Sequence, residues 1–173
     1  MHSTAAQLSN HIKRAVSGPM WHGPSLDELL ASVSSDQAAA RPIPGAHSIW
    51  EIVLHVTAWA EIARARLHGQ RTGDPAPDED WPPVPESGPP VPGSVPGSDP
   101  AASWHAALER LRESHRALAT DTRRLEPSAF DDKVAGADYS VSNLLHGVIE
   151  HDTYHGGQIA LLKRALEARA TRI

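Results

Sequence analysis

Cysteine is absent from this chain of 173 residues. Its absence excludes disulfides, thiolate metal sites and a cysteine nucleophile. Without thiolates, histidine is the main nitrogen ligand that the chain offers a transition metal, and the sequence contains eleven histidines. A site for a transition metal would have to draw on these imidazoles.

The chain also lacks long apolar runs and clusters of positive charge. No stretch approaches the roughly 20 apolar residues of a membrane span, and the first residues form no signal-peptide core, so we expect a cytoplasmic protein without a membrane partner. The net charge is −5 and the sixteen Lys and Arg residues are dispersed, which gives no electrostatic reason to expect nucleic acid as a partner. The length is that of a single domain, residues 1–173.

Proline is abundant but unevenly distributed, because ten of the fifteen prolines lie between Pro75 and Pro100. Proline removes a backbone donor and restricts φ, so residues 70–99 are predicted to be irregular. This segment is either a disordered linker or a long crossover that packs on the surface, with Trp81 as an anchor. A crossover is attractive because a helical bundle with parallel neighbours needs one.

Outside this segment, apolar residues recur at helical spacing in four long stretches. They lie before Ser17, from Ser48 to Gly69, from Asp99 to Pro127, and from Ser140 to about Ala168. A shorter helix starts where Ser25 and Glu28 form a capping box. With no convincing strand, the sequence predicts an all-α protein, a four-helix bundle with a long Pro-rich crossover. Four tryptophans are expected to be core aromatics, namely Trp21, Trp50, Trp104 and Trp59, the last as a possible pocket wall.

Two histidines interrupt the apolar stripe of the last helix. His151 and His155 continue the stripe of Leu144 and Val148, where an ordinary bundle helix carries Leu or Val. At i and i+4 their rings lie on one face of the helix, close enough to bind one ion. His55 lies inside the stripe of an earlier helix and is a third inward histidine. Three neutral imidazoles suit Zn²⁺, Ni²⁺ or Cu²⁺ and leave a coordination position open, whereas the alternative for each is a hydrogen-bonded core histidine.

Glu51 and Gln158 are candidates for supporting this site. Glu51 lies one turn before His55 and can orient its ring or accept a proton as a catalytic base. The competing interpretation is that Glu51 forms a second capping box with Ser48. Gln158 lies one turn after His155 and can hold that ring in place, with a solvated glutamine as an equal alternative.

We expect structural or surface roles, rather than metal binding, for several other polar residues near His151 and His155. Asp152 is expected to be a solvated charge, and His47 shows no feature beyond a surface position. His115 falls on a core stripe and is expected to be a core histidine, with a fourth metal ligand as the alternative. His146 precedes His151 by five residues, about 140° around the helix, so it should point away from the ligand face.

These segments resemble a known family, the DinB/YfiT-like superfamily, over nearly the whole chain. The resemblance rests on Ser48-Ile49-Trp50-Glu51-Ile52-Val53-Leu54-His55, His151-Asp152-Thr153-Tyr154-His155-Gly156-Gly157-Gln158-Ile159, Trp21-His22-Gly23-Pro24-Ser25 and Asp80-Trp81-Pro82-Pro83. It implies a four-helix bundle with a long crossover, often a homodimer, that holds Zn²⁺ or Ni²⁺ on three histidines. Matched residue by residue, the ligands fall on His55, His151 and His155.

The resemblance leaves several activities open, because a bundle fold alone does not choose among them. Some members of the family use bacillithiol, mycothiol or glutathione. We therefore expect a metal-dependent S-transferase that presents a metal-bound thiolate of a low-molecular-weight thiol to electrophilic small molecules. A hydrolase that uses metal-bound water is the first alternative, and a non-catalytic, metal-stabilised stress-response protein is the second. The sequence shows no basic cluster near the ligands that would recognise a carboxylate of the thiol.

Overall fold

A computed structural model describes residues 3–85 and 99–171 of the chain. Within these ranges every regular element is helical and no strand forms, which confirms the predicted all-α class. The elements are α1 (Thr4–Ser17), α2 (Leu26–Leu30), α3 (Ser35–Ala39), α4 (Ile49–Leu67), α5 (Pro77–Asp80), α6 (Pro100–Arg123), the 3₁₀ turn η1 (Pro127–Phe130) and α7 (Val141–Ala170).

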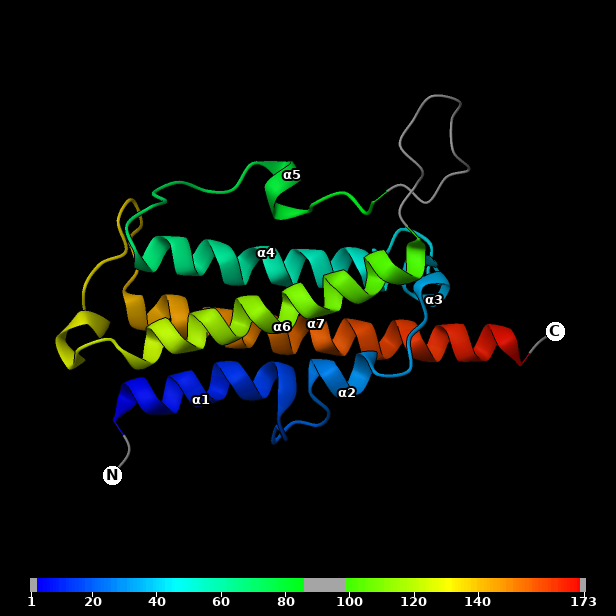
Figure 1. Cartoon of the computed structure of the whole chain (residues 1–173), viewed down its shortest axis with the longest axis horizontal. Helices are drawn as coiled ribbons and strands as arrows, with labels where there is room; N and C mark the ends of the chain where they lie inside the picture. The colour runs from blue at the N-terminus through cyan, green and yellow to red at the C-terminus, as the bar shows by residue number, and fades with distance from the viewer. Residues whose placement is uncertain (1–2, 86–98, 172–173) are drawn as a thin grey trace.

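The four long helices α1, α4, α6 and α7 lie side by side (Figure 1). Each of α6 and α7 packs against both α1 and α4, so the four helices enclose a shared core. The colours of Figure 1 show that α4 and α6 run in the same direction, opposite to α1 and α7. The chain therefore has to return along the length of α4 before α6 begins, which is the crossover that the sequence suggested.

Local capping signals set where the helices begin. The predicted capping boxes Ser25–Glu28 and Ser48–Glu51 both form, with each serine side chain accepting from the third backbone amide of its helix. Asp99 and Ser140 cap α6 and α7, at the positions where the sequence predicted these helices to start. Each cap satisfies a backbone donor that the first turn of a helix cannot satisfy internally.

The crossover differs from the prediction in one respect. Residues 77–80 form the single turn α5, whose Pro77 stands at a first-turn position where a helix tolerates the missing N–H. Trp81 follows this turn and packs on α4, so the predicted anchor is confirmed. The remainder of the predicted irregular segment includes residues 86–98, which lie outside the described residues.

Two apolar clusters fill the interior of the bundle, one near each end. The cluster beside α2 and α3 includes Ile52 and Ile159, and the cluster at the opposite end includes Ala60 and Val148. Between them α4, α6 and α7 contribute buried or half-buried polar side chains, here called the polar layer, which consists of His55, His115, His151, Asp152 and His155. A polar layer inside a helical core costs free energy unless its groups find partners.

One predicted core residue lies outside both clusters. Trp21 follows α1 in a turn, and its side chain is fully exposed, so the prediction of a core aromatic at this position is wrong. Trp50 and Trp104 are buried as predicted and contact each other. In the described part of the chain, no helix has both the length and the hydropathy that a bilayer span requires.

Candidate metal centre

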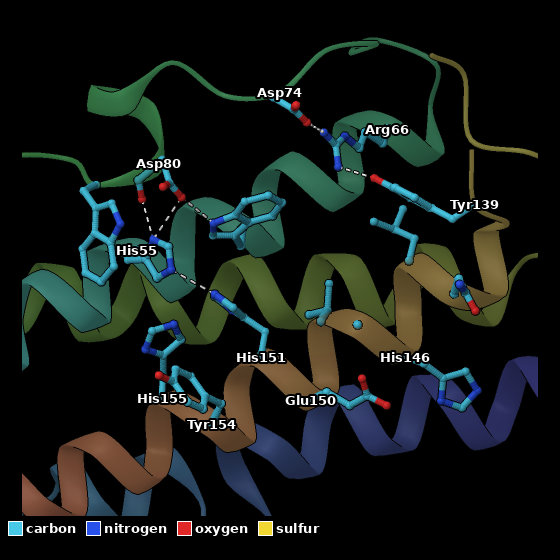
Figure 2. A pocket seen from close by; sticks show the side chains of 16 residues that line it. His55, Arg66, Asp74, Asp80, Tyr139, His146, Glu150, His151, Tyr154 and His155 are labelled. Carbon is cyan, nitrogen blue, oxygen red and sulfur yellow. Dashed lines mark hydrogen bonds and ion pairs between the residues drawn. The ribbon is translucent and has the colours of Figure 1, made fainter. Parts of the chain in front are cut away.

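The polar layer brings the three predicted ligands together. His55 comes from α4, and His151 and His155 come from adjacent turns of α7 (Figure 2). One ligand atom from each ring lies within 4.8 Å of the other two, and Nε2 of His55 lies 2.9 Å from Nε2 of His151. Because His151 and His155 are four residues apart, helical geometry alone places both rings on the face that meets His55.

Two of the rings are held in a defined tautomer by oxygen acceptors. The Nδ1–H of His55 donates to the carbonyl oxygen of Asp80 over 2.6 Å. The Nδ1–H of His155 donates to Oε1 of Gln158 over 2.7 Å. Since these oxygens only accept, the proton stays on Nδ1 and the Nε2 lone pair is free to bind an ion.

His151 completes the set in a way that fits a cation. Its Nδ1 is buried and has no hydrogen-bond partner among the described residues. Its Nε2 faces Nε2 of His55, where two lone pairs repel unless a proton or a cation lies between them. Three imidazole nitrogens within 4.8 Å of one another are a suitable donor set for a divalent metal ion.

Electrostatics keep all three rings neutral. Burial is the main cause that lowers the pKa of His151, to about 3, and the adjacent His155 and His55 lower it further. Burial also lowers the pKa of His55 and of His155, against opposing hydrogen bonds from their acceptors. A neutral imidazole is the form that binds a metal, so the site is prepared for an ion near neutral pH.

Aromatic residues close one side of the site. The Trp81 ring stacks on the His55 ring at a centroid distance of 3.8 Å, and its other face stacks on His47 at 3.7 Å. The Trp59 indole N–H donates to Oδ1 of Asp80 over 2.7 Å. The start of the crossover is thereby fastened to α4, and it delivers the carbonyl that orients His55. His47, expected only at the surface, is part of this stack.

A pocket of about 840 Å³ opens from the three histidines. Its walls come from α4, α7 and the crossover, and Trp59 lines it as predicted (Figure 2). His146 is exposed and lines another part of the same pocket, and it does not belong to the three-histidine group. The site is therefore open to a ligand, unlike a closed structural metal site.

A sequence model of the DinB superfamily matches residues 21–159, a range that includes all three histidines. The chain belongs to the DinB superfamily. Comparisons with curated proteins and with solved structures find no match. Membership agrees with the all-α fold and with the predicted family.

In this DinB-superfamily protein, the Glu51 carboxylate is engaged at the start of α4. Its Oε2 accepts from the Ser48 backbone amide over 2.7 Å, and its Oε1 accepts from Arg41 over 2.5 Å. Burial raises the pKa of Glu51, but the hydrogen bonds from Ser48 outweigh it and the pKa is lower than usual. Glu51 therefore forms the capping box with Ser48 that was the competing interpretation. It is not among the residues that line the pocket. A catalytic role for Glu51 stays a prediction.

The prediction that Asp152 is a solvated charge is wrong. The residue is buried, with 2 % of its surface exposed. Its Oδ2 lies 3.2 Å from Nε2 of His115, whose side chain is equally buried. The Nδ1–H of His115 donates to the carbonyl oxygen of Leu111 over 2.8 Å, so His115 is a core histidine as expected. It does not belong to the three-histidine group.

The fold also places a cation where the sequence suggested none. Arg66 ends the apolar face of α4 and lines the pocket, although its side chain is only 6 % exposed. Sequence reasoning missed Arg66 and Asp80. The spacing of Arg66 from His55, eleven residues or about three helical turns, was the one available signal for Arg66. Asp80 acts on His55 through its backbone carbonyl and through its carboxylate, whose Oδ1 lies 3.3 Å from Nδ1 of His55, and spacing within single helices gave no sign of this contact.

Proposed function

We propose that this protein is a metal-dependent enzyme, an S-transferase that joins a low-molecular-weight thiol to an electrophilic small molecule. The observation that supports it is the group of three histidines, with one ring nitrogen of each within 4.8 Å of the others, at the wall of an open pocket. Zn²⁺ and Ni²⁺ are the ions that we propose, because both accept neutral imidazole ligands. The pocket volume lies within the range of small-molecule sites.

A divalent ion in this site would lower the pKa of a thiol that reaches it. The residues of the chain prepare that step. Asp80 and Gln158 accept from Nδ1 of two rings and leave their Nε2 lone pairs free, and Trp59 and Trp81 pack against one side of the site. The open side of the pocket receives the electrophile, and the sulfur forms the new bond as the leaving group departs.

The carboxylates around the pocket favour a thiol over water as the nucleophile. Asp74, Asp80 and Glu150 are the described carboxylates that line it. Asp80 accepts from the Trp59 indole, Asp74 lies beside Arg66, and Glu150 is exposed. Hydrolysis commonly uses a general base beside the attacking water. A thiol has a much lower pKa than water and needs less help to ionise.

The first test is the metal content of purified protein. His151→Ala should lose the bound ion, because two imidazoles hold a divalent metal far more weakly than three. His146→Ala is the matched control, since His146 lies on the same helix and lines the same pocket. Elemental analysis of both variants measures the effect. Unchanged metal in His151→Ala would overturn the metal site.

The second test separates the candidate chemistries. Metal-loaded protein should bind a low-molecular-weight thiol, and chelation should abolish that binding; calorimetry with bacillithiol, mycothiol and glutathione measures both. If none of the three binds while ester or amide substrates are cleaved without thiol, the protein is a hydrolase instead. If neither occurs, the ion stabilises a non-catalytic protein.

A homodimer is a further part of this proposal. Three large apolar side chains, Trp21, Tyr154 and Leu161, are exposed, and a dimer interface would remove such surface from water. Sedimentation equilibrium of the full chain tests this, with a monomeric mass as the contradicting result.

A further inference from the structure

Arg66 is a buried cation in the wall of the pocket. Its guanidinium group donates to the Tyr139 hydroxyl and, over 2.9 Å, to the Gly73 carbonyl oxygen, both of which are neutral. Its one carboxylate contact in the described residues is to Asp74, at 3.4 Å, and the Asp74 side chain is fully exposed. A charge on a fully solvated carboxylate is screened by water, so it compensates a buried guanidinium poorly.

The position of this cation relative to the three histidines follows from α4 itself. Eleven residues correspond to slightly more than three full turns, so Arg66 and His55 lie on the same face of the helix. The Trp59 ring lines the pocket and is close to both of them, with its centroid 6.4 Å from that of the His55 ring. Arg66 Cζ is 5.8 Å from the Trp59 ring centroid, and that centroid is 5.9 Å from the His151 ring. A ligand that contacts both ends needs to span no more than these two distances together.

We propose that Arg66 is an anion subsite of this pocket, and that it binds a carboxylate of the same thiol whose sulfur end lies at the three histidines. The proposal rests on the proposed function for the identity of the sulfur end. A guanidinium group presents paired donors that match a carboxylate, and such charge-assisted bonds are strong when water is excluded.

A carboxylate fits this subsite better than a phosphate. One guanidinium supplies a single positive charge, which a carboxylate balances. A phosphate monoester carries about −1.5 to −2 charges at pH 7. The excess charge would face Asp74 and Glu150, both of which line the pocket. The subsite therefore selects a singly charged group at this end of the ligand.

The experiment compares two probes that differ only in their terminal group, 6-mercaptohexanoate and 6-mercaptohexanol. Calorimetry with zinc-loaded protein measures both dissociation constants. We expect the acid to bind roughly tenfold tighter or more, because a buried charged hydrogen bond is worth more than a neutral one. Equal affinities would overturn the anion subsite and leave the thiol-binding function in place.

Two arginine variants locate the effect. In Arg66→Gln the acid and the alcohol should bind with about equal affinity, and the affinity for the alcohol should be the same as in the unmodified protein. Arg64→Gln is the matched control, because Arg64 lies in the same turn, pairs with Asp121 and is half exposed. It removes the same charge and should keep the preference. Retention of the preference in folded Arg66→Gln, checked by circular dichroism, would overturn the assignment to Arg66.

A third arm separates the subsite from the proposed function. If neither thiol binds, the sulfur end of the proposal has failed, and hexanoate is compared with hexanol by NMR titration. Shifts in the signals of Tyr139 and Trp59 with hexanoate alone would support the subsite. No response to either compound would overturn it. The comparison uses the unmodified protein, so it does not depend on the folding of a variant.

Discussion

His151 and Asp152 are neighbours on α7, but their side chains serve different sides of the bundle. His151 turns toward α4 and the pocket, where it meets His55 and His155. Asp152 turns toward α6, where it lies at ion-pair distance from His115. The first side is an open three-histidine site, and the second side is sealed from solvent.

The pKa of the same residue type shifts in opposite directions on the two sides. Burial and the adjacent imidazoles lower the pKa of His151 to about 3, so the ring is neutral near pH 7. Burial also lowers the pKa of His115, but the Asp152 carboxylate outweighs it and raises that pKa above the ordinary value. Imidazole neighbours thus favour the neutral form of a buried histidine, whereas a carboxylate neighbour favours the charged form.

The largest effect on stability is expected from removing the carboxylate of the buried Asp152–His115 pair. Asp152→Asn leaves the buried His115 without its carboxylate, so the free energy of unfolding should fall by about 3–5 kcal/mol. Urea unfolding of metal-free protein measures the change. Asp138→Asn is the control, because Asp138 pairs with Lys133 at the surface, and its effect should stay within about 0.5 kcal/mol. A comparable small loss in Asp152→Asn would show that the sealed side is not a charged pair.

Metal binding at the three histidines should stabilise the folded protein, and this stabilisation should not require the Asp152–His115 pair. Zn²⁺ at about 1,000 times its dissociation constant should raise the free energy of unfolding by about 4 kcal/mol. His155→Ala should abolish this gain, whereas Asp152→Asn should keep it despite its lower starting stability. His105→Ala, at an exposed position of α6, is the control. If His155→Ala still gains the full increment, His155 is not a ligand.

The smallest effect concerns the orientation of a single ring. Gln158→Ala removes the acceptor that holds His155 and should weaken metal binding by about 10–100-fold. A chelator competition titration measures the affinity, and the metal-free stability should hardly change. Gln7→Ala, at an exposed position of α1, should leave the affinity as it is. Equal affinities for the two variants would show that the Gln158 contact does not prepare the site.

Local features of the sequence were reliable guides to this protein. Helix starts at Ser48 and Ser140 were predicted because a capping side chain acts on its own first turn. His151 and His155 were placed on one face because helical spacing needs no information from elsewhere in the chain. The inward direction of His55 followed from the apolar residues around it.

Long-range features could not be predicted in the same way. Asp80 contacts His55 through both its backbone carbonyl and its carboxylate, although it lies 25 residues away in the chain, and no local spacing marks such a contact. Trp21 has the composition of a core residue but lies in an exposed turn. Arg66 joins the pocket only because the crossover and the loop before α7 close over the end of α4.

The amino-acid sequence by itself determined the helices, their apolar stripes and the three histidines that interrupt them, since these depend on spacing within single helices. Tertiary structure decided which way each neighbour of those histidines turned. In the folded chain Asp152 lies beside His115, Asp80 contacts His55, and Arg66 lines the pocket. The reason is physical: helical periodicity is a local property, whereas the rotation of a helix against its neighbours is set by the packing of the whole core.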